Sequence, residues 1–155
     1  MVQHAPISNA LLESVDIVSA SMPGGTLVNG VGVDMRGWDG VAALIAVPTV
    51  AAGGNYQASL QMADDAAFTQ NLTTITDAGT GIVCQSPTGQ VAGTFWLEAY
   101  RPWRRFVRSQ INPAGPATQL VTASVYMLRY RHTGLYPVTA RDSLGLTNRV
   151  VVRAS

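Results

Sequence analysis

The chain contains no lysine, and charged residues make up only 12% of its 155 residues. A typical soluble domain has roughly 25%, so we expect much of the surface to be neutral and polar or covered by other subunits. All ten cations are arginines. Arginine is favoured at interfaces because its planar guanidinium forms paired hydrogen bonds and stacks on rings. A GC-rich coding bias, which the abundant alanine also fits, remains an equally open explanation.

Cysteine and long apolar runs are also scarce. The single Cys84 excludes an internal disulfide, and a lone thiol is usually a small buried apolar side chain. No run of 18 apolar residues is present, so we predict no membrane span and no membrane partner. The first residues lack the basic start and apolar segment of a secretory signal. The length predicts one domain with its own core.

Catalytic and metal-binding motifs are missing from the chain. We find no GxSxG, P-loop, HExxH or GxGxxG pattern, and neither His4 nor His132 has zinc-site spacing. The pair Asp64-Asp65 has too few oxygen-bearing neighbours for calcium, so a solvated turn is predicted. Glu98 has no obvious second carboxylate for sugar hydrolysis. We therefore predict a protein that is not an enzyme and has no cofactor or metal.

Short strands separated by proline and glycine turns account for most of the chain. Val41–Val47, apolar on both faces, predicts a central strand, and the two glycines of Leu27–Met35 predict a bent one. Eight or nine such strands predict an all-β fold: an antiparallel β-sandwich, jelly-roll-like or immunoglobulin-like, with extended N- and C-terminal arms. The clearest strand is Asn55–Ala63, whose predicted buried face consists of Tyr56, Ala58, Leu60 and Met62.

Three regions follow from this pattern. Residues 1–36 are an N-terminal arm with the first strands, 37–131 the sandwich body, and 132–155 a C-terminal arm. The first 14 residues are predicted to be an arm or a short helix capped by Ser8. Two interpretations of 132–155 remain open: an arm that adds a strand to a neighbouring molecule, or the last strand of the same sandwich.

Charge is distributed unevenly along the chain. Residues 1–100 carry one arginine and eight acidic residues, a net charge of −7, whereas 101–155 carry nine arginines and one acidic residue, a net charge of +8. Such a split can orient association between copies or with another protein. Alternatively, the two halves interleave in one fold and neutralise each other.

Arginines and aromatic residues are concentrated between Val91 and Arg131. Within this region, residues 101–108 have three possible roles. They could bind nucleic acid through phosphate contacts and stacking, form a protein interface, or plug the end of the core. The nearly neutral net charge argues against nucleic acid, so we predict a protein interface. Its predicted contact residues, including those on the C-terminal arm, are Trp38, Trp96, Tyr100, Arg101, Trp103, Arg104, Arg108, Tyr136, Arg149, Val151 and Arg153.

Three segments, LQMADDAAFT, TFWLEAYRPWRRFVRSQI and ATQLVTASVYMLRY, together resemble small phage structural proteins of the capsid decoration, or cement, type. The resemblance covers about residues 41–131, and the arms at 1–36 and 132–155 depart from the shortest members. The matching residues are Asp64, Asp65, Phe68, Tyr100, Arg105, Phe106, Val107 and Arg108.

This resemblance implies a β-sandwich made in the host cytoplasm and carried on the outer capsid surface of the virion. Its partners would be the major capsid protein and further copies of itself, as a dimer or trimer. Two alternatives stay open. One is another structural component of the phage neck or tail, and the other is a carbohydrate-binding β-sandwich that uses Trp96, Tyr100 and Trp103 as a stacking platform.

Overall fold

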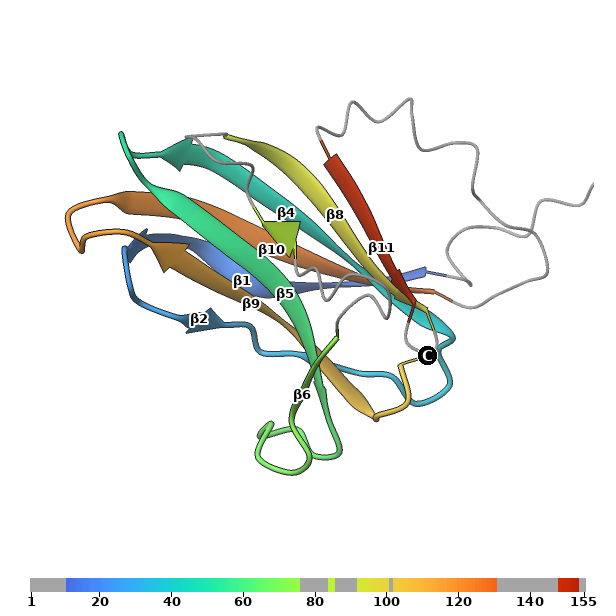
Figure 1. Cartoon of the computed structure of the whole chain (residues 1–155). Coiled ribbons are helices and arrows are strands. Elements are labelled where there is room, and N and C mark those ends of the chain that lie inside the picture. Colours follow the sequence, from blue (N-terminus) through green and yellow to red (C-terminus); the bar gives the residue numbers. More distant parts are fainter. Residues whose placement is uncertain (1–10, 76–83, 86–91, 101, 131–147, 154–155) are drawn as a thin grey trace, which may run out of the picture.

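Within the residues that it describes, the computed structural model contains eleven strands in two sheets that pack face to face (Figure 1). None of the segments it describes is helical, so no helix among them is long and apolar enough to span a membrane. The residues described are 11–75, 84–85, 92–100, 102–130 and 148–153, with the backbone alone at 11–13, 19–20, 84–85, 95–96, 100 and 148–153.

Five strands form the first sheet, in which neighbouring strands are antiparallel except at one edge. At that edge β11 runs parallel to β8. In spatial order the strands are β1 (Leu11–Pro23), β10 (Leu120–Tyr130), β4 (Gly40–Val50), β8 (Gly93–Tyr100) and β11 (Asn148–Arg153).

The second sheet is antiparallel and contains several very short strands. Two short strands pair with β9 and two with β5, so each pair acts as one interrupted strand. Its members are β2 (Val28–Asn29), β3 (Val33–Asp34), β9 (Phe106–Ala114), β5 (Asn55–Ala63), β6 (Thr73–Ile75) and β7 (Cys84–Gln85).

The strand order is that of a jelly roll. With β2–β3 and β6–β7 each counted once, β1 to β10 make eight successive strands. One sheet holds the first, eighth, third and sixth, and the other holds the second, seventh, fourth and fifth. Two sheets woven in this way characterise the jelly roll, so the predicted sandwich class is confirmed. Strand β11 is added beside β8, outside the eight-strand set.

The core lies between the two sheets and follows the two-residue alternation of the strands. Strand β5 has the predicted bounds and inward face, and β4 is the central strand of its sheet as predicted. For β9 the sequence left the inward set open, and the structure turns the odd positions inward. Inward residues of the longer strands include Val41, Ala43, Ile45, Tyr56, Leu60, Met62, Leu97, Val107, Ile111, Val125 and Met127.

The N-terminal strand begins earlier than predicted. Residues 11–14 were predicted to be part of an arm or short helix, but they extend β1 and pair with residues 127–130 of β10. A strand pairing with a long partner outweighs the weak helix signal of so short a segment. Residues 1–10 lie outside the described residues.

Asp16 links the two sheets at the β1 side of the sandwich. It sits where the β1–β10 register shifts, so its buried carboxylate turns toward the second sheet. There Oδ1 accepts a hydrogen bond from the Gly32 amide at 2.5 Å, and Oδ2 accepts from the Ser109 amide at 2.7 Å and from the Ser109 hydroxyl. The Val31 amide donates to the Asp16 carbonyl at 3.1 Å. A buried carboxylate is thereby supplied with the donors that it needs.

Candidate protein-binding surface at the loop end

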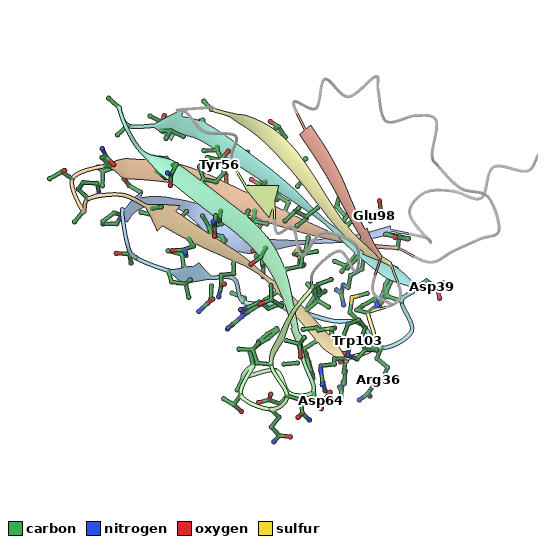
Figure 2. The ribbon with its side chains drawn as sticks, in the orientation of Figure 1. Arg36, Asp39, Tyr56, Asp64, Glu98 and Trp103 are labelled. Atoms are coloured by element: carbon green, nitrogen blue, oxygen red, sulfur yellow. The ribbon has the colours of Figure 1, made fainter. Side chains whose placement is uncertain are left out.

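Three loops meet at one end of the sandwich, which we call the loop end. They are residues 35–39 after β3, 64–72 after β5 and 102–105 after β8. The Met35 amide donates to the Arg105 carbonyl at 2.7 Å, which joins the first loop to the third. Figure 2 shows Arg36, Asp64 and Trp103 gathered at this end.

The loop after β5 is fixed by its own polar groups. Asp65 Oδ1 accepts hydrogen bonds from the amides of Thr69 and Gln70 at 2.9 and 2.8 Å, and Oδ2 accepts from the Thr69 hydroxyl at 2.7 Å. These donors, with the Gln70 amide first, lower the pKa of Asp65. The Asp65 carboxylate is therefore committed to shaping the turn that the sequence predicted.

Asp64 attaches this loop to the one after β8. The Arg104 guanidinium donates from one nitrogen to Asp64 Oδ1 at 2.9 Å and to Oδ2 at 2.8 Å. The Asn71 side-chain amide donates to Oδ2 at 2.6 Å. The Asn71 hydrogen bond and then the Arg104 hydrogen bond lower the pKa of Asp64. The two loops are thus held together across 40 residues of sequence.

Asp34 provides a second anchor for the loop after β8, because it binds Arg105. Arg105 donates through Nε and a terminal nitrogen, the shortest contact being 2.8 Å, and the Arg36 amide donates to Asp34 Oδ1 at 2.9 Å. The Arg105 hydrogen bond is the main cause that lowers the pKa of Asp34 to about 2. The same contact raises the pKa of Arg105. Arg129 adds a hydrogen bond to the Asp34 carbonyl at 2.7 Å.

The uneven charge along the sequence had two explanations, oriented association with another molecule or two halves that interleave in one fold. For the four residues of these ion pairs, the structure supports the second explanation. Asp34 and Asp64 come from the acidic part of the sequence, and Arg104 and Arg105 come from the basic part. The halves interleave and neutralise each other at the loop end. The same pairing occupies arginine donors that a phosphate would need, which further weakens a nucleic-acid interpretation.

Trp103 comes directly before these two anchored arginines on the loop after β8 and is 54% exposed. The residues that follow it, Arg104 and Arg105, are each tied to a carboxylate. At this exposure Trp103 does not plug the end of the core, which was one of the alternatives that the sequence left open. A large exposed aromatic residue on a loop that is already ordered loses little conformational freedom on binding, and tryptophan is among the residues most often dominant in protein interfaces.

Phe68 and Arg108 pack on the outer side of the second sheet. Phe68 is buried, but it is not part of the core cluster between the two sheets. It adopts a left-handed backbone, with φ of 56°, and the Arg108 guanidinium lies 4.5 Å from its ring centre. Arg108 Nε also donates to Gln61 Oε1 at 2.9 Å, and burial lowers the pKa of Arg108. Arg108 thus serves an internal contact, and its predicted interface role stays a prediction.

Trp38 also makes internal contacts. It is half-buried against the core, and the Arg129 guanidinium lies 5.5 Å from its ring centre. Glu98 is buried and accepts a hydrogen bond from the Tyr130 hydroxyl at 2.6 Å. This carboxylate is therefore part of the packing of the first sheet.

The remaining predicted contact residues lie on β8 and β11 or outside the described part of the chain. The backbones of Trp96, Glu98 and Tyr100 pair with β11. Of the two interpretations that the sequence left open for the last segment, residues 148–153 therefore fit the second, because they form the last strand of the same sandwich. The β11 partners in that pairing are Arg149, Val151 and Arg153. Arg101 and Tyr136 lie outside the described residues.

Sequence reasoning missed Arg36 as a member of the surface. It is exposed at the loop end, and its amide helps to hold Asp34. The sequence placed it in a turn, but only the Asp34–Arg105 contact shows which other loop that turn lies against. Its position was therefore not visible in local spacing.

No protein-family model matches the chain, and no curated protein matches it. Solved structures match as folds. The PBSX exported protein XepA has a TM-score of 0.54 and 12% identity, over 91% of this chain and 44% of XepA. The VP2 subviral particle of infectious bursal disease virus has a TM-score of 0.48 and 16% identity, over 84% of this chain and 35% of that chain. The chain thus spans less than half of either protein, and at 12% identity the likeness to XepA shows the fold alone.

Proposed function

We propose that this chain is a non-enzymatic structural protein of a phage virion, a decoration or cement protein that binds the outer surface of the assembled capsid. The observation that carries the proposal is the exposed Trp103 on a loop anchored by two ion pairs. The fold shared with the exported protein XepA and the resemblance of residues 41–131 to decoration proteins support it.

The binding mechanism follows from this geometry. Trp103 would enter a pocket between neighbouring major capsid subunits, and Arg36 would lie at the polar rim. Because Arg104–Asp64 and Arg105–Asp34 hold the loop before contact, little ordering cost opposes binding. A protein that binds the assembled shell but not free subunits stabilises the shell by mass action.

The test is co-sedimentation of the purified full chain with assembled phage heads that lack it. We expect Trp103→Ala to bind the heads at least about tenfold more weakly, as for the dominant residue of an interface. Trp103 is exposed, so this variant should melt at the same temperature as the unmodified chain. The matched control is Leu120→Ala. Leu120 is also an exposed apolar residue, but it is the first residue of β10, and the opposite end of β10 is the one that contacts the loop end.

Equal binding of Trp103→Ala and the unmodified chain would remove Trp103 as the anchor. Specific binding to a glycan array, with no binding to heads, would favour the carbohydrate-binding alternative. Binding to tails or necks and not to heads would move the protein to another place in the virion.

A further inference from the structure

The loop of residues 64–72 joins two paired strands, and one side chain fixes how it folds back onto the second sheet. Its ends continue into β5 and β6, whose last and first residues lie beside the register pair Met62 and Thr73. Within 64–72, all of which the structure describes, Phe68 is the one buried residue. Because apolar burial is what a solvent-exposed loop can offer to hold itself in place, its position depends on the Phe68 ring.

The Phe68 ring packs into a space that the second sheet leaves for it. A Cβ at Gly32 would lie 2.6 Å from two carbons of the ring, so the ring fits only because this residue is glycine. The Arg108 guanidinium lies over the ring at 4.5 Å from its centre, and Gln61 holds Arg108 Nε at 2.9 Å. The Gly32 amide is bonded to the Asp16 carboxylate. Both sides of the contact are therefore fixed before the loop packs on them.

Two residues of the same loop have left-handed backbones that side chains other than glycine rarely adopt. Phe68 has a φ of 56° and Asn71 a φ of 52°. Such conformations persist where the surrounding contacts hold the chain. The burial of the ring supplies that contact at Phe68, and the Asp64 amide closes the loop by donating to the Gln70 carbonyl at 3.2 Å. In this closed form Asn71 donates its side-chain amide to Asp64 Oδ2 at 2.6 Å.

Asp64 carries this order to the loop after β8. Its carboxylate accepts from the Arg104 guanidinium at 2.8 and 2.9 Å, and Arg104 directly follows Trp103. Asp64 and Trp103 lie at the same end of the sandwich (Figure 2). If the Phe68 ring left its contact, the left-handed turn at Asn71 would relax, the carboxylate would lose its Asn71 donor, and Arg104 would lose a fixed partner.

We propose that Phe68 is a positioning residue for the capsid-binding surface, because its packing against Gly32 and Arg108 keeps the loop that carries Trp103 in its binding form. What Trp103 binds rests on the proposed function, whereas the order of the loop can be measured without any capsid. A loop that spends more time in other forms binds more weakly in proportion to the lost population.

The test follows cleavage of the full chain by trypsin, which cuts after arginine when the local backbone opens. Mass spectrometry measures the rate of cleavage after Arg104. Phe68→Ala should raise this rate at least about tenfold, because cleavage tracks the population of the open loop. Cleavage after Arg129, within β10, should change by less than about twofold, because the opening is local and the sheets stay folded.

Leu72→Ala is the matched control, since Leu72 is an exposed apolar residue of the same loop, and cleavage after Arg104 should not change. Asp64→Asn should also raise this cleavage. Phe68→Ala added to Asp64→Asn should raise it little further, because both substitutions act through one ion pair. If Phe68→Ala fails to fold, Phe68→Leu, which lacks a flat ring for Arg108, should still raise cleavage at least about threefold.

Co-sedimentation with phage heads completes the test, and Phe68→Ala should bind at least about fivefold more weakly than the unmodified chain. Unchanged cleavage after Arg104, an equal rise after Arg129, effects of Phe68→Ala and Asp64→Asn that add in full, or undiminished binding of Phe68→Ala to heads would each overturn the inference. If the unmodified chain does not bind heads, the proposed function fails, and the cleavage rates alone decide whether Phe68 positions the loop.

Discussion

At the scale of single residues, the arginines whose side chains the structure describes act mainly as internal partners. Arg104 and Arg105 each hold a carboxylate from a distant loop, and Arg108 and Arg129 lie against Phe68 and Trp38. The sequence predicted a protein interface in this region. Trp103 is exposed there, and its interface role stays a prediction. Local spacing could not show the ion pairs, because Asp34 and Arg105 are 71 residues apart.

Asp34 should contribute to the acid sensitivity of the fold. Its pKa is lowered to about 2, chiefly by Arg105, so the folded state binds a proton less readily than the unfolded chain does. The stabilisation is present above about pH 4 and is lost as the pH falls toward about 2. Urea unfolding at several pH values should therefore show a smaller acid loss for Asp34→Asn than for the unmodified chain.

The control for Asp34 is its partner. In an Arg105→Gln background, Asp34→Asn should change the acid loss much less, because the main cause of the low pKa is gone. The effect is small, since the pair is solvent-exposed. An identical acid loss with and without Asp34 would contradict this account of the ion pair.

At the scale of strands, alternation predicted the elements that have one clear buried face. Strand β5 was placed residue for residue because Tyr56, Ala58, Leu60 and Met62 alternate with polar residues. The start of β1 was missed because residues 11–14 gain their strand conformation from β10, which is distant in sequence. The parallel placement of β11 likewise depends on β8 and leaves no local signal.

The link between β1 and the second sheet gives a sharp test of the fold. Asp16→Asn replaces an acceptor with a donor facing the amides of Gly32 and Ser109 and the Ser109 hydroxyl. We expect a loss of about 2–4 kcal/mol in the free energy of unfolding, as for a broken buried hydrogen-bond network. Urea unfolding monitored by tryptophan fluorescence provides the measurement.

Ser21→Asn, an exposed change on the same strand, is the control and should shift the free energy of unfolding by less than about 0.5 kcal/mol. If Asp16→Asn were as mild as this control, the carboxylate would not be what joins the sheets.

At the scale of the whole molecule, the jelly roll separates two surfaces. The loop end presents Trp103 on an anchored loop, and the β1 side presents the exposed side chains of Val18 and Val31. The sequence predicted the sandwich class from strand and turn spacing. It pointed to the first surface through clustered aromatic residues and arginines. It gave no sign of the second, because valines in a strand are as compatible with a core as with an exposed edge.

The central claim is that the protein binds the outside of a phage capsid through the loop end. Electron microscopy of phage heads with and without the added full chain tests it most directly. The account predicts additional density on the outer surface, over joints between capsid subunits, with the Trp103 end of the sandwich against the shell. Heads that look the same with and without the chain, or density whose contact is made by the opposite end of the sandwich, would contradict it.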